Sequence, residues 1–279
     1  MPIGPGEASN TVRRGRAAPD HARLCKATHE CSLIKNPVAR EAAHATKPKQ
    51  PAMPRMKRCA RCEDLGLTKA EIAVLKRLST PRKIQDFVTA IPANFEPHGD
   101  TCLSVREVLR QRRAHCIEAA MLAACALWAH GEPPLLMDMK AKHDFDHVVA
   151  LYRRRGCWGA ITKSNDGLLR SRDPVYRTLR ELAMSYFHEY ANERGLKSLR
   201  SYSRPFDLRR LDPKLWVTKP KHCWDVGTRL EEIRHYPLVT RAQLRLLHRR
   251  DAMERKIGKL LEFRPRRKGK TRMKRRGSK

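Results

Sequence analysis

The sequence contains no long apolar stretch. Its longest stretch without a charged residue, 119–131, has thirteen residues and includes His130, whereas a membrane-spanning helix needs about 18 or more apolar residues. The N-terminal region also lacks the apolar segment behind a basic start that marks a secretory signal peptide. We therefore predict no membrane span and a cytoplasmic location, where the nine cysteines would remain thiols.

Acidic and aromatic residues are both scarce. The chain has 29 Asp and Glu against 60 Lys and Arg, which gives a formal net charge of +31, and only 6% of its residues are aromatic. No RNA-binding or helix-turn-helix pattern is present, so specific base recognition has no support. The excess of basic residues predicts at most a salt-sensitive, non-specific affinity for nucleic acid or another polyanion.

The basic residues are concentrated at the two ends of the chain. Residues 1–58 hold 12 basic and 4 acidic side chains together with seven prolines, and residues 264–279 hold 10 basic side chains and no acidic one. Neither end has apolar residues at helix or strand spacing, which is typical of disordered segments. We predict a basic arm at 1–58, a folded domain at 59–263 and a polybasic tail at 264–279.

The first half of this domain has helical patterns. Thr68 and Glu71 form a capping-box pair before apolar residues at helical spacing, and a second helix is expected at 81–91 and a third at 104–111. The segment 119–128 is apolar on all sides, which predicts a helix buried in the core.

Strand patterns follow the apolar segment. The runs 135–139, 147–152 and 157–162 are strand-like, with 153–156 as a hairpin turn. This order predicts an α+β fold in which a buried helix packs against a small antiparallel sheet. Downstream we predict helices at 174–190, 229–233 and 243–261, and a loop-like segment at 200–220.

Cys116 is the candidate nucleophile. It stands at the start of the predicted buried helix, after Arg112, Arg113 and His115. The positive end of a helix and neighbouring cations both favour the thiolate, which is the nucleophilic form. On its own, a cysteine among alanines is as readily explained by packing. We predict that His115, although adjacent, lies on another face of the helix and is the weaker base.

His147 is the candidate base, because it leads the second predicted strand and could face the central helix. The next strand runs into Lys163, Ser164, Asn165 and Asp166. The amide of Asn165 or the carboxylate of Asp166 could accept the far N–H of the imidazole and hold its tautomer. Together these residues would form a Cys–His–Asn/Asp triad.

The order of these groups resembles that of the transglutaminase-like superfamily, within the papain-like cysteine fold. The resemblance is clearest over 101–166 and looser over 68–263, where the sequence is similar to an uncharacterised group of transglutaminase-like proteins. It rests on the segments 112–119, 146–150, 163–165 and 172–177. It implies acyl transfer or amide hydrolysis on a peptide or small-molecule substrate, without a cofactor.

Three positions depart from the pattern of that superfamily. Ala114 stands where a Gly is usual, Val149 stands where a Trp is usual, and Thr162 stands where an Asp is common. The third member of the triad is therefore displaced or replaced. We rank Asn165 first and Asp166 second, with Asp173 as a distant third.

Two other patterns could suggest a metal site, but we predict none. Cys59 and Cys62 have the spacing of half a zinc knuckle, yet no second such pair exists. The acidic segment around Asp144 and Asp146 lacks a complete ligand set. The alternative to an enzyme is a catalytically inactive protein of the same fold that binds polyanions through its basic ends and has an unreactive Cys116.

Overall fold

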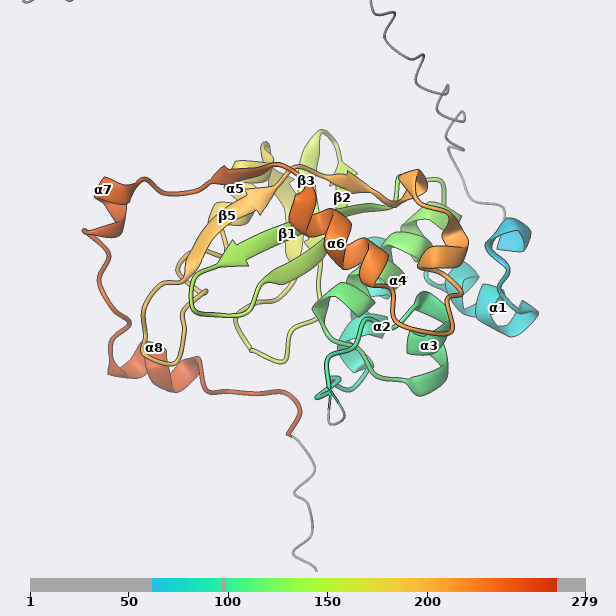
Figure 1. Cartoon of the computed structure of the whole chain (residues 1–279), viewed down its shortest axis with the longest axis horizontal. Helices are drawn as coiled ribbons and strands as arrows, with labels where there is room; N and C mark the ends of the chain where they lie inside the picture. The colour runs from blue at the N-terminus through green and yellow to red at the C-terminus, as the bar shows by residue number, and fades with distance from the viewer. Residues whose placement is uncertain (1–61, 97–98, 265–279) are drawn as a thin grey trace, which may run out of the picture. The chain divides into compact units, whose positions relative to one another are not determined.

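The computed structural model describes residues 62–96 and 99–264 (Figure 1). The predicted arm at 1–58 and all of the predicted tail after Arg264 lie outside these residues, and so does Cys59. Within the described ranges, none of the helices has the length and apolar character that crossing a bilayer requires.

Three short α-helices of the described chain precede the central one, and each begins after a capping residue, of which Thr68 was predicted. Helix α1 spans Lys69–Arg77, α2 spans Pro81–Ala90 and α3 spans Val105–Gln111. Thr68, Thr80 and Ser104 accept hydrogen bonds from the backbone of the first turns, and Thr68 and Glu71 complete the predicted capping box. All three helices pack against α4.

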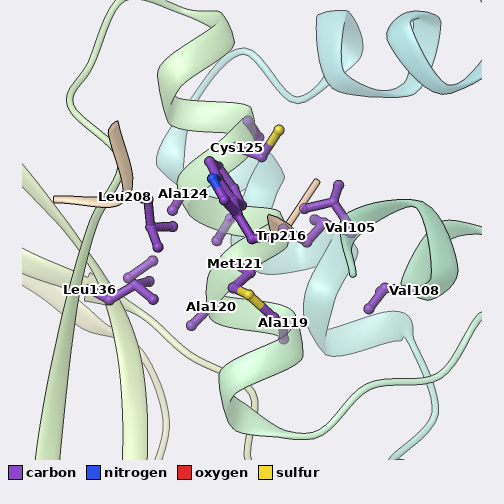
Figure 2. Packing of buried hydrophobic residues seen from close by; sticks show 14 of the residues in the cluster. Val105, Val108, Ala119, Ala120, Met121, Ala124, Cys125, Leu136, Leu208 and Trp216 are labelled. Carbon is purple, nitrogen blue, oxygen red and sulfur yellow. The ribbon is translucent and has the colours of Figure 1, made fainter. Parts of the chain in front are cut away.

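The central helix α4 spans Cys116–Ala129, and its residues from Glu118 to Trp128 are all buried. Alanine favours the helix and lets neighbouring elements approach closely. Figure 2 shows Leu136 and Leu208 on one side of α4 and Val105 and Val108 on the other. The prediction of a helix buried on all sides is confirmed.

The sheet is antiparallel and has seven strands. Its strands are β1 (Leu135–Ala141), β2 (His147–Arg154), β3 (Cys157–Ile161), β4 (Arg172–Tyr176), β5 (Leu199–Ser203), β6 (Phe206–Asp207) and β7 (His235–Pro237). The order is β4-β3-β2-β1-β5-β7, with β6 paired to β1. The predicted meander forms the centre of the sheet, and further strands join both of its sides.

Two downstream predictions were wrong in part. The predicted helix at 174–190 is divided between strand β4 and the short helix α5, Leu179–Met184; Pro174 is tolerated because β4 is an edge strand. The segment 200–220 contains β5 and β6 rather than only a loop.

The remaining helices lie near the C-terminal end of the described chain. Helix α6 spans Trp224–Glu232 and includes most of the predicted helix at 229–233. The predicted long helix at 243–261 is two short helices, α7 (Arg241–Leu244) and α8 (Ala252–Ile257). The caps Thr240 and Asp251 start these helices independently, so no single long helix forms.

The sheet separates two apolar clusters, as strand alternation requires. Val148 and Ala150 pack in the cluster that contains α4, whereas Val149 and Leu151 pack with residues of α5 on the other face. Because β2 contributes to both clusters, its position relative to α4 is held from two sides.

We predict that Leu122→Ala lowers the free energy of unfolding by about 2–5 kcal/mol, because it opens a cavity in the core. Leu122 is fully buried in the cluster around α4. The matched control is Leu246→Ala, since Leu246 is 73% exposed and its truncation should change stability by less than about 0.5 kcal/mol. Denaturant unfolding of both variants measures the difference, and equal losses would contradict this account of the core.

Candidate active site

A cleft of about 730 Å³ opens between the N-terminal end of α4 and the adjoining end of the sheet. Its lining includes Cys116, His115 and His147, together with residues of the loop after β3. The structure therefore brings the candidate nucleophile and the candidate base to one accessible cavity.

Cys116 is the first residue of α4, and its half-buried side chain faces the cleft. The thiol hydrogen-bonds the imidazoles of both His115 and His147. Burial raises the pKa of the Cys116 thiol, but the two imidazole hydrogen bonds and the charges of both rings outweigh burial and hold the pKa well below its usual range. The two imidazoles therefore favour the thiolate form of the sulfur.

His147 is 5% exposed and is the first residue of β2. Its Nε2 forms a 2.6 Å hydrogen bond with Thr162 Oγ1, which leaves Nδ1 for the thiol. The ring also lies edge-on to Tyr186. Because both a hydroxyl and an aromatic ring contact the imidazole, its orientation toward Cys116 is determined by the surrounding side chains.

Thr162 is itself held in place by helix α2. The side chain of Gln85 accepts a hydrogen bond from Thr162 N at 3.0 Å and donates one to Thr162 O at 2.9 Å. A glutamine amide thus continues the backbone pairing one residue beyond the end of β3. This support explains how a threonine, which has a short side chain, reaches the imidazole.

The hydrogen bond that the sequence assigned to Asn165 or Asp166 is therefore made by Thr162 instead. The Asn165 amide pairs with the backbone of Phe263, at 3.0 Å and 2.8 Å. Asp166 Oδ1 accepts from Leu168 N at 2.7 Å. Asn165 and Asp166 line the cleft, whereas Asp173 lies in β4 and is exposed. Thr162 stands where the sequence resemblance leads one to expect an Asp, and this departure was the signal for the arrangement.

His115 is a residue of the site that the sequence interpretation underrated. It precedes α4 rather than lying on a distant helix face, and its Nε2 is 2.9 Å from Thr101 O. The same nitrogen lies 3.3 Å from Glu118 Oε1 and 3.4 Å from Glu96 Oε1. Burial lowers the pKa of His115, but its bond to Cys116 and the charges of Cys116 and Glu118 raise the pKa to about 9.

Glu118 organises this end of the helix, although it has no exposed surface. Its carboxylate accepts hydrogen bonds from the backbone N of Leu103 at 2.8 Å and of His115 at 2.9 Å. The Thr101 hydroxyl and the Asn94 amide add further donors. A buried carboxylate needs this number of partners, and together they connect the segment 94–103 to the first turn of α4.

The described residues contain no group of three or more His, Cys, Asp or Glu side chains arranged to hold a metal ion. The two carboxylates of the acidic segment between β1 and β2 have structural partners. Asp144 accepts from Ser198 Oγ at 2.6 Å, and Asp146 accepts from Ala141 N at 2.8 Å.

We predict that Thr162→Val slows alkylation of Cys116 by iodoacetamide at neutral pH about 10-fold, the equivalent of one hydrogen bond. Valine keeps the shape of the side chain but leaves His147 Nε2 without its partner. Mass spectrometry of the labelled peptide measures the rate. Asn165→Ala is the control and should leave the rate unchanged; the reverse ranking would assign the orienting role to Asn165.

Comparisons with models of protein families and with curated protein sequences find no match to this chain. The function therefore has to be inferred from the side chains of the cleft.

Proposed function

We propose that this protein is a cysteine-dependent acyl-transfer enzyme of transglutaminase-like type, acting on an amide or thioester through Cys116 and His147. The observation that carries the proposal is the thiol hydrogen-bonded to His147 inside an open cleft. A papain-like arrangement, with the nucleophile at the start of a buried helix and the base on the adjoining sheet, is consistent with this geometry.

In the first half of the proposed reaction, His147 takes the proton of the Cys116 thiol, and the sulfur attacks the carbonyl carbon of an amide substrate. A C–S bond forms, and the electron pair of the carbonyl π bond moves to oxygen. The Cys116 backbone N–H, at the positive end of α4, is placed to stabilise this oxyanion. His147 then gives its proton to the departing amine as the C–N bond breaks, which leaves a thioester on Cys116.

The second half reverses these roles. Water or an amine attacks the thioester and gives its proton to His147, the C–S bond breaks, and the sulfur leaves as a thiolate. The acid or the new amide is released. Thr162 acts through His147: its bond to Nε2 holds the ring so that Nδ1 faces the sulfur throughout.

His115 has a different role in this scheme, because its surroundings keep it protonated. Glu118, Glu96 and the Thr101 carbonyl all lie within 3.4 Å of its Nε2. A charged imidazolium beside the sulfur stabilises the thiolate but is a poor proton acceptor. The two imidazoles therefore divide the work: His115 stabilises the anion, and His147 transfers the proton.

The proposed function predicts a thioester that hydroxylamine traps. With a mixture of acyl peptide amides as substrate, the wild-type chain should release hydroxamates, and Cys116→Ala should lose on the order of 10³-fold or more of this activity. His147→Ala should lose a similar amount, because the thiolate would lack its proton carrier.

Cys157→Ser is the matched control for this assay, since Cys157 is a half-buried free cysteine that does not line the cleft. It should retain full activity. If the wild type forms no hydroxamate from any acyl donor and iodoacetamide does not label Cys116, the proposal fails and the inactive, polyanion-binding alternative is favoured.

The role of His115 predicts a change in the pH dependence of labelling. His115→Asn keeps a good N-cap residue but removes the imidazolium, so the pKa of Cys116 should rise toward its ordinary value. Labelling of the variant by iodoacetamide should therefore be slower than that of the wild type at neutral pH. The two rates should converge at about pH 9, where an ordinary thiol also ionises.

His130→Asn is the control for this pH profile, because His130 ends the same helix and its Nε2 lies 3.0 Å from Leu75 O, away from the cleft. Its profile should match that of the wild type. A profile for His115→Asn that also matches the wild type would mean that His147 alone lowers the pKa of the thiol.

A further inference from the structure

The charge of the cleft is opposite to that of the chain. Six carboxylates line it, and the lining includes one lysine and no arginine, although Lys and Arg outnumber Asp and Glu by 60 to 29 in the sequence. The carboxylates are those of Glu96, Asp100, Asp144, Asp146, Asp166 and Glu189. A concave surface lined by one sign of charge concentrates ligands of the other sign.

The one lysine of the lining contributes little positive charge to the cavity. Lys163 is 2% exposed, and its Nζ donates to Thr89 O on α2 at 3.0 Å. Its ammonium lies 4.5 Å from the ring centre of Phe263 and 4.0 Å from Glu262. Burial lowers the pKa of Lys163 to about 8. The Lys163 ammonium therefore already has partners behind the wall of the cavity.

Three of the carboxylates accept hydrogen bonds from neutral donors, which do not cancel their charge. Asp144 accepts from Ser198 Oγ, Asp146 from Ala141 N and Asp166 from Leu168 N. Asp100 is exposed. Glu189 is paired with Arg172, and Glu96, which accepts from Thr101 N at 2.6 Å, also lies 3.4 Å from the charged His115 ring. Four fixed or exposed carboxylates therefore remain for a ligand.

Exposed aromatic rings line the same cleft. Phe145 is 90% exposed, Trp224 48% and Phe95 43%. Phe145 stands between Asp144 and Asp146, and the Tyr190 hydroxyl donates to its carbonyl, which anchors this part of the loop. Aromatic faces next to carboxylates are a combination that binds ammonium and guanidinium groups, because the rings attract cations and the aliphatic stems pack on them.

Residues 260–263 pair with the loop that follows β3, beside the cleft. Glu262 N donates to Asn165 O at 3.1 Å, Gly167 N donates to Leu260 O at 3.3 Å, and the Asn165 amide pairs with Phe263. Asn165 and Asp166 line the cavity. The loop after β3 thus binds polypeptide backbone at the cleft, and the segment that it binds is followed by the basic residues from Arg264 onward.

We propose that the cleft takes polypeptide substrates rich in Lys and Arg, whose cationic side chains bind the four remaining carboxylates and the aromatic rings while an acyl group reaches Cys116. The statement about substrate rests on the proposed function, but binding does not require catalysis. A binding assay on a chain without the nucleophile therefore tests the recognition separately from the reaction.

The probe is a fluorescent eight-residue peptide with four lysines, and its control has uncharged serine at the same four positions. Fluorescence anisotropy with the full-length Cys116→Ala chain should show binding of the lysine peptide that weakens as salt is added, and no binding of the serine peptide. Equal binding of both peptides, or of neither, would overturn the proposal. Hydroxamate release by the wild-type chain reports on the reaction independently.

Two sets of variants locate the binding. Asp100→Asn combined with Asp146→Asn should weaken binding about 10-fold, since each exposed ion pair contributes about threefold. Asp86→Asn combined with Asp212→Asn removes the same charge from residues that do not line the cleft. This control should change binding by less than twofold, about the size of a long-range screened effect. Equal losses would show that total charge, and not the cleft, determines binding.

Trp224 provides a test that leaves the charge unchanged. Trp224→Ala should weaken binding of the lysine peptide about fivefold, whereas Trp224→Phe should retain most of it, because an aromatic face over a cation contributes about 1 kcal/mol. If Trp224→Ala binds like the Cys116→Ala parent, the aromatic part of the proposal is wrong.

Discussion

The buried carboxylate of Glu118 is the interaction on which the geometry of the site depends. It lies one turn inside α4 with no exposed surface and is satisfied by donors from Asn94, Thr101, Leu103 and His115. These bonds attach the segment before α3 to the start of α4, so that Cys116 and His115 have defined positions. The Glu118 carboxylate also faces the His115 ring. The group that fixes the start of α4 therefore also stabilises the positive charge of His115 beside the sulfur.

The electrostatics of the site follow from this arrangement. Burial among apolar residues raises the pKa of a thiol, and it acts in this direction on Cys116. The two imidazoles outweigh burial and lower the pKa of Cys116, but their own surroundings differ. His115 lies among carboxylates and a carbonyl, which stabilise its charged form. His147 bonds a neutral hydroxyl and lies against an aromatic ring. This difference is the physical basis for assigning the two histidines separate roles.

The position of His147 shows how the sheet and the helix cooperate. By strand alternation it belongs to the face of Val149 and Leu151, which pack on α5 and not on α4. It reaches the thiol because it is the first residue of its strand, at the end of the sheet where the N-terminus of α4 also lies. Thr162, which follows the last residue of β3, stands on the same end of the sheet and is fixed by Gln85 from α2. Three elements thus meet around one imidazole.

The sequence by itself determined the local features: the cap at Thr68, the buried helix, the central hairpin, and Cys116 and His147 as candidates for one site. Each of these depends on periodicity, on capping chemistry or on a short motif, all of which are local. Only the tertiary structure shows that Thr162 bonds His147 and that His115 lies among carboxylates. Thr162, and not Asn165 or Asp166, bonds His147 because it is held by Gln85 of α2, which lies 77 residues earlier in the chain. His115 is charged because acidic groups from separate segments lie around its ring. Such choices are made by distances between residues that the chain separates, and no local pattern encodes them.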